Sequence, residues 1–82
     1  FLNTNRMNDS SKKKLDDLVN EFYEYGQRNY SESSNSRKEI NHLYTMKEHW
    51  KNGTKDSEGK IPTAGEIGYI IYYLRWKRIL PF

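Results

Sequence analysis

Apolar residues recur with a helical period in three separate stretches of the chain. In the first stretch they are three and four residues apart, so a helix gathers them on one side. They are Leu15, Leu18, Val19, Phe22 and Tyr25. The pattern begins at Ser10 and Ser11, and Gly26 indicates the last turn or the end. We predict a helix over residues 11 to 28.

The second stretch carries signals at both ends. Ser36 is followed three residues later by Glu39, the spacing of a capping box, and Asn52-Gly53 is a typical helix end. The apolar positions are Ile40, Leu43, Met46 and Trp50, with Tyr44 at one edge. Lys47 falls between them, and we expect its methylenes on the stripe and its charge in water. We predict a helix over residues 36 to 52.

The third stretch is the most apolar and the richest in aromatic residues. Pro62 precedes Thr63, an N-cap with Glu66 three residues on, and Pro81 closes the pattern. We predict a helix over residues 63 to 79 with two apolar sides. One side holds Ile67, Ile70, Ile71 and Leu74, and the other holds Tyr69, Tyr72, Tyr73, Trp76 and Leu80. The competing interpretation is a buried strand over residues 69 to 74, but the cap and the spacing favour a helix.

These elements predict an all-α fold, a small three-helix domain over residues 11 to 82 after a flexible lead-in over residues 1 to 10. The aliphatic side of the third helix should pack on the stripes of the other two. A chain of 82 residues buries only about 60% of its unfolded surface, so its core is small. With no Cys, disulfides cannot add stability, and packing against a partner becomes the expected support.

The aromatic side of the third helix is the main candidate site. Aromatic residues make up 15% of the chain and include seven Tyr, which suit half-buried surfaces. Trp, Tyr and Arg are enriched where binding energy concentrates in interfaces. The leading hypothesis is a non-catalytic adaptor, inhibitor or assembly subunit. It would bind a protein partner, in a hetero-complex or a homodimer, through Tyr69, Tyr72, Tyr73 and Trp76.

Charge supports an alternative hypothesis, a DNA- or RNA-binding module. The net charge is +3, and the excess lies in residues 36 to 82, with nine Lys or Arg against five acidic residues. Candidate phosphate contacts are Arg75, Lys77, Arg78, Lys12, Lys13 and Lys14. The structural interpretation is that the C-terminal group complements the helix dipole. In the same interpretation the three Lys form a solvated face paired with Asp16 and Asp17.

The segment Pro62-Thr63-Ala64-Gly65-Glu66-Ile67-Gly68 resembles the opening of the first helix of a helix-turn-helix unit in winged-helix and related DNA-binding domains. In that register residues 75 to 80 would begin the recognition helix, and the resemblance implies DNA binding. It covers about a quarter of the chain. Residues 71 to 74 depart from it, because they lack the Gly or polar residues of such a turn.

We expect neither enzymatic activity nor a cofactor. His42 and His49 are seven residues apart, about 10 Å along a helix, which is too far for one metal. No Gly-rich phosphate loop and no nucleophile with a base is visible. No apolar run reaches the ~18 residues of a membrane span. A membrane-surface role for residues 69 to 82 is disfavoured, because the fold needs the aliphatic side. Without a signal peptide or Cys, we expect an intracellular protein.

Overall fold

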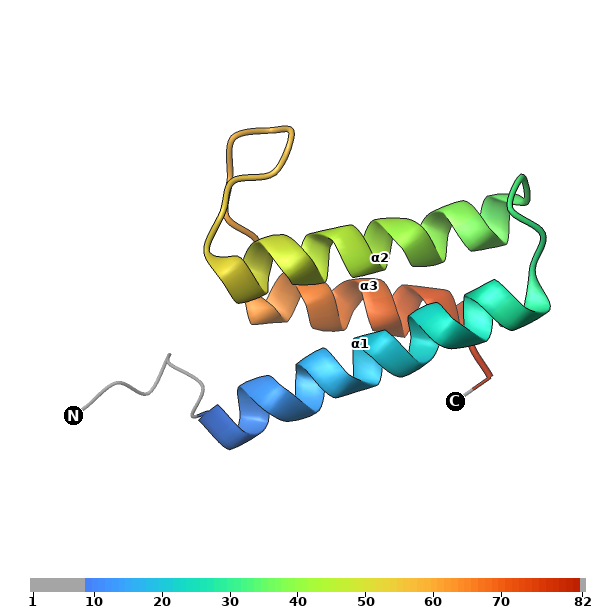
Figure 1. The fold of residues 1–82 in the computed structure, drawn as a ribbon, viewed down its shortest axis with the longest axis horizontal. Coiled ribbons are helices and arrows are strands. Elements are labelled where there is room, and N and C mark those ends of the chain that lie inside the picture. The colour runs from blue at the N-terminus through green and yellow to red at the C-terminus, as the bar shows by residue number, and fades with distance from the viewer. Residues whose placement is uncertain (1–8, 82) are drawn as a thin grey trace.

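The structure, a computed structural model, describes residues 9–81, and these form three α-helices. They are α1 (Asp9–Asn29), α2 (Asn35–Asn52) and α3 (Ala64–Trp76). Successive helices run in opposite directions, so α1 and α3 point the same way (Figure 1). Residues 9–81 contain no strand, which confirms the all-α prediction and makes residues 67 to 76 helical. Of the expected lead-in, residues 1 to 8 lie outside the described part, and Asp9 and Ser10 already belong to α1.

α1 continues to Asn29, with Asp9 in its first turn and Arg28 in its last, where each complements the helix dipole. Gly26 lies in the last turn as predicted, but its main role is packing. A Cβ at this position would lie 3.1 Å from Cδ1 and 3.2 Å from Cγ2 of Ile40 on α2. The missing side chain is therefore what lets α1 and α2 approach each other.

The ends of α2 are determined by one serine and one glycine. The N-cap is Ser34 and not Ser36, because the Ser34 hydroxyl accepts a hydrogen bond from the Arg37 amide. The Ser36 prediction was wrong by two residues. At the other end Gly53 adopts the left-handed conformation, with φ of 68°, and its amide donates to the His49 carbonyl, as the Asn-Gly signal predicted.

α3 begins with the predicted capping box. The Thr63 side chain accepts from the Glu66 amide, and Glu66 accepts from the Thr63 amide. The helix ends at Trp76, three residues earlier than predicted, where Arg78 turns into the left-handed region with φ of 63°. The amides of Arg78 and Ile79 then donate to the carbonyls of Arg75 and Leu74, a Schellman motif.

Two expectations about the C-terminal segment are wrong. Leu80 does not belong to the aromatic side, because the chain folds back after α3 and buries Ile79 and Leu80 in the core. The Tyr30 hydroxyl holds this segment by donating to the Ile79 carbonyl over 2.6 Å. The helix-turn-helix register also fails, since residues 71 to 74 lie inside α3 and residues 77–81 form no helix.

The core contains the predicted stripes together with this C-terminal segment. Its buried members are Val19, Phe22, Ile40, Leu43, Ile67, Ile71, Leu74, Ile79 and Leu80. Partly buried residues pack around them, including Leu15, Leu18, Met46, Trp50 and Ile70. The aliphatic side of α3 therefore faces the other helices, as predicted, and its opposite side remains outside the core.

Lys47 departs from the expectation that its charge would reach water, because it is only 1% exposed. Its ammonium lies 2.7 Å from Asp16 Oδ1, 2.8 Å from Asn20 Oδ1 and 2.5 Å from Glu48 Oε2. Burial by itself lowers the pKa of Lys47, but the hydrogen bonds to Asp16 and Glu48 outweigh it and raise that pKa. Asp16 thus pairs across to α2 and not with Lys12.

Candidate interaction surface

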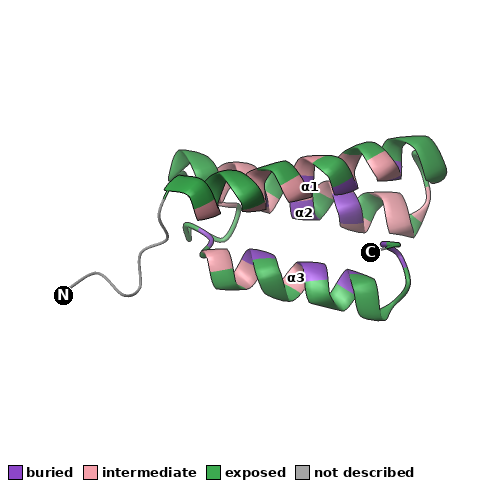
Figure 2. Cartoon of the chain, turned by 90° about the horizontal axis from the view of Figure 1, so that it is seen from below, coloured by how far each residue is buried: buried purple, intermediate pink, exposed green. Residues whose placement is uncertain are grey.

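Four large aromatic side chains stand on the outer side of α3. Tyr69, Tyr72, Tyr73 and Trp76 are 69%, 66%, 38% and 71% exposed. We call them the aromatic face. They line one surface hollow of about 230 Å³. Figure 2 shows α3 as one side of the molecule, with exposed positions along its outer edge and buried positions toward α1 and α2.

The position of the aromatic face follows from the helical period. At about 100° per residue, positions 69, 72 and 76 fall within a narrow sector opposite the buried Ile71 and Leu74. At other positions within residues 9–81, aromatic rings pack against the rest of the chain. Phe22 is fully buried, and Tyr23 stacks on Tyr44 with ring centroids 4.2 Å apart. The aromatic face thus combines large apolar area with high exposure.

Sequence analysis missed two glycines on the same side of α3. Gly65 and Gly68 are exposed, and both have helical backbone. A Cβ at Gly68 would meet nothing within 4 Å, and one at Gly65 would meet only the Thr63 hydroxyl of its own cap, at 3.8 Å. Glycine inside a helix costs about 0.5–1 kcal/mol relative to Ala. Unlike Gly26, these two have no packing reason within the described part of the chain.

The basic residues after Leu74 do not form one patch. The Arg75 guanidinium lies 5.7 Å from the ring centre of Phe22, on the α1 side. Lys77 lies on the α2 side, with Nζ 3.7 Å from Glu39 Oε2 and 5.1 Å from the centre of the Tyr73 ring. The pKa of Lys77 is raised, first by its interaction with the Tyr73 hydroxyl and then by the Glu39 charge. Arg78 is exposed at the turn that follows.

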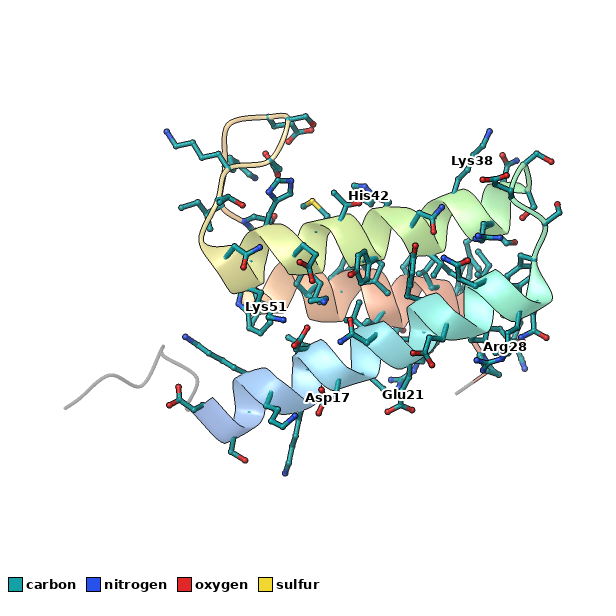
Figure 3. All side chains as sticks on the ribbon, viewed as in Figure 1. Asp17, Glu21, Arg28, Lys38, His42 and Lys51 are labelled. Atoms are coloured by element: carbon teal, nitrogen blue, oxygen red, sulfur yellow. The ribbon has the colours of Figure 1, made fainter. Side chains whose placement is uncertain are left out.

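The other predicted basic group, Lys12 to Lys14, lies far from these residues. It occupies the first turns of α1, and because α1 and α3 run in the same direction it is at the opposite end of the molecule (Figure 1). Lys13 pairs with Asp17 over 3.2 Å, as predicted. Figure 3 places Asp17 and Glu21 along one side of α1, directed away from α2. The six basic candidates are therefore not brought together.

The two histidines are also apart. His42 projects from the outer side of α2 near Lys38 (Figure 3), beside a groove of about 520 Å³ between α2 and α3. His49 Nδ1 lies 2.9 Å from the Thr54 hydroxyl. Residues 9–81 contain no group of three or more His, Asp or Glu placed to hold a metal ion.

None of the helices in the described residues combines the length and apolar character needed to cross a membrane.

Comparison of the chain with other proteins adds no assignment. No family model, no curated protein and no solved structure matches the chain, so its function has to be inferred from its own residues.

Proposed function

We propose that the protein is a non-catalytic binding protein that uses the aromatic face of α3 against a protein partner. The observation that carries this proposal is the exposure of Tyr69, Tyr72 and Trp76, each about two-thirds or more, on a helix whose other side already fills the core. Isolated exposed apolar residues are ordinary, but a contiguous apolar patch is typical of an interaction site.

The side chains of the aromatic face are suited to a surface that is exposed to water in the free protein and buried in a complex. Tyr and Trp offer a large apolar area with a polar tip, and they lose little conformational entropy on binding. The hollow shared by the four rings can receive a side chain of the partner. Residues of this kind carry most of the energy in protein interfaces.

Photo-crosslinking tests the proposal. A photoreactive phenylalanine in place of Tyr72 should give an adduct in an extract of the cells that make the protein. The same group at Glu21, on the outer side of α1, is the matched control (Figure 3). Trp76→Ala should abolish the adduct at position 72 while the circular dichroism stays unchanged, because Trp76 is 71% exposed. Equal labelling at both positions, or an unfolded Trp76→Ala variant, would refute the proposal.

A nucleic-acid partner is the second candidate, supported by the position of Trp76 between the exposed Arg75 and Arg78. Stacking on Trp76 with phosphates at the arginines would be the mode of binding. It is less well supported, because Arg75 and Lys77 extend to opposite sides of α3. Fluorescence anisotropy with labelled DNA and RNA across salt concentrations tests it. Affinity that falls linearly in log salt and is lost on neutralising Arg75, Lys77 and Arg78 would favour this candidate.

A further inference from the structure

We propose that the protein partner of the aromatic face is a second copy of this chain, packed through α3 in an antiparallel pair. This inference rests on the proposed function and names the partner of the same surface. It starts from the two exposed glycines of α3. Gly68 weakens the interior of the helix and has open space above it, and a Cβ at Gly65 would meet only the Thr63 hydroxyl. A helix gains from such positions when another backbone or a large side chain comes close.

The exposed side of α3 has the spacing of a helix-packing seam. Gly65, Tyr69, Tyr72 and Trp76 follow one another at steps of four, three and four residues. This is the a/d spacing with which one helix packs along another. Because Ile67, Ile71 and Leu74 are buried on the opposite side, the seam is directed away from the core. It runs almost the full length of α3 and is therefore suited to another helix.

An antiparallel pair of identical seams is complementary in size. The two-fold axis is perpendicular to both helices and passes between positions 69 and 72. A residue on one side of this level in one copy then faces a residue equally far on the other side of it in the second copy. Trp76 then lies over Gly65 of the other copy, and Tyr69 lies beside Tyr72 of the other copy. Trp76, the largest side chain of the seam, thus packs over Gly65, the position of the seam that has no side chain. A parallel pair would instead oppose Trp76 to Trp76 and leave the two glycines facing each other.

Charge favours the same direction. Glu66, Tyr73 and Lys77 project on the same flank of the seam. A two-fold axis of this kind places equal flanks opposite each other, so Glu66 at the start of one α3 faces Lys77 at the end of the other. Their present salt bridges are long, with Glu66 Oε2 3.8 Å from Lys60 and Lys77 3.7 Å from Glu39. Oε1 of Glu66 accepts from the Thr63 amide in the capping box, which leaves Oε2 for the second copy. In a parallel pair, by contrast, opposite flanks meet, so Glu66 would lie near Gly68 of the other copy and Lys77 would lie near the like-charged Arg75.

The area available is sufficient for a weak dimer. A Tyr or Trp side chain buries about 150–250 Å² when covered, so the exposed parts of the four rings amount to roughly 500 Å² per copy. A total on the order of 1,000 Å² is the lower limit for a specific interface. We therefore expect a dissociation constant in the micromolar range.

Sedimentation equilibrium of the purified chain tests the pair. The 9.9 kDa chain should shift to twice that mass as concentration rises through the micromolar range. Trp76→Ala should raise the dissociation constant at least tenfold. Gly68→Gln should raise it as well, because Gly68 borders the seam between Gly65 and Tyr72 and a long side chain there would hold the two helices apart. Gly68→Gln should at the same time raise the melting temperature at concentrations where the protein is monomeric, since Gln is the better helix former. Glu21→Gln, on the outer side of α1, is the control and should change neither quantity.

The direction of packing is tested by isotope-filtered nuclear Overhauser spectra of a mixed labelled and unlabelled sample. Gly65 and Trp76 are eleven residues apart, about 16 Å along one helix, so a contact between them must join two copies. Signals from the Trp76 ring to the Gly65 α-protons support the antiparallel pair. Signals between the two Trp76 rings would refute it.

The sedimentation and photo-crosslinking results together separate this inference from the proposed function. If the chain stays monomeric to about 1 mM, or dimerises with no effect of Trp76→Ala and Gly68→Gln, the inference is wrong. A Trp76-dependent photo-adduct of a different mass would then still support the proposed function. Absence of both the dimer and the adduct would refute both, and an adduct of twice the chain mass would support both.

Discussion

The buried ammonium of Lys47 allows a sharp prediction about stability. Asp16→Ala removes the carboxylate on α1 that lies 2.7 Å from Nζ, while the ammonium stays 1% exposed. Removing one partner of a buried ion pair costs about 3–5 kcal/mol when nothing replaces it. Because Glu48 and Asn20 remain within 2.8 Å of the nitrogen, we expect a loss of about 2 kcal/mol.

Lys47→Met should be milder, although it removes the more deeply buried residue. Methionine keeps the volume of the apolar stem, and the charge that had to be desolvated is gone. Asp16 keeps Lys51 at 3.1 Å, so its carboxylate is not left alone. Removing one partner of a buried pair is costly when the other charge stays buried and alone, but here Asp16 and Glu48 are 17% and 37% exposed. We therefore expect a change below about 1 kcal/mol. The double variant should be more stable than Asp16→Ala alone, with a coupling of about 1–2 kcal/mol.

Urea unfolding at pH 7, followed by circular dichroism, measures all four proteins of this cycle. Additive effects of the two substitutions would contradict this prediction, and so would an Asp16→Ala variant within about 0.5 kcal/mol of the wild type by linear extrapolation. Such a result would mean that only the stem of Lys47 is buried and that its charge is hydrated.

The same pair determines how stability depends on pH. The pKa of Asp16 lies below its ordinary 3.8, chiefly through the hydrogen bond from Lys47, so its contribution is lost as pH falls through the lowered value. The pKa of Lys47 lies above its ordinary 10.5, so its contribution is complete below that pH and is lost as pH rises through the raised value. Stability should therefore be level between about pH 5 and 9, and Lys47→Met should weaken its decline in acid.

Three further predictions concern backbone and packing. Gly26→Ala should destabilise by about 1 kcal/mol, because crowding against Ile40 exceeds the gain in helix propensity, and a higher melting temperature would contradict this. Arg78→Gly should stabilise by about 0.5–1 kcal/mol in urea unfolding, because glycine is unstrained at φ of 63°; a loss would mean that the Arg78 side chain makes a compensating contact. Tyr30→Phe should cost about 1 kcal/mol, since it leaves the Ile79 carbonyl without its 2.6 Å donor, and unchanged stability would show that water replaces the hydroxyl.

The helices and their packing sides could be predicted from the sequence because they depend on local signals. The spacing of Ile67, Ile71 and Leu74 identified the buried side of α3, and the Thr63–Glu66 box identified its start. Tyr69, Tyr72 and Trp76 could be assigned to the opposite side for the same reason. Caps and helical period require only residues within one or two turns of each other.

The remaining features depend on contacts between distant parts of the chain. The spacing of residues could not predict three of these features. They are the burial of Lys47 beside Asp16, the position of Leu80 in the core, and the room that Gly26 leaves for Ile40. Each depends on where another helix lies. The contrast between the glycines is of the same kind, since only the tertiary structure shows Gly26 covered and Gly68 open. The helical period of the sequence establishes which residues share a face, and the packing of the helices establishes which of those faces remain exposed.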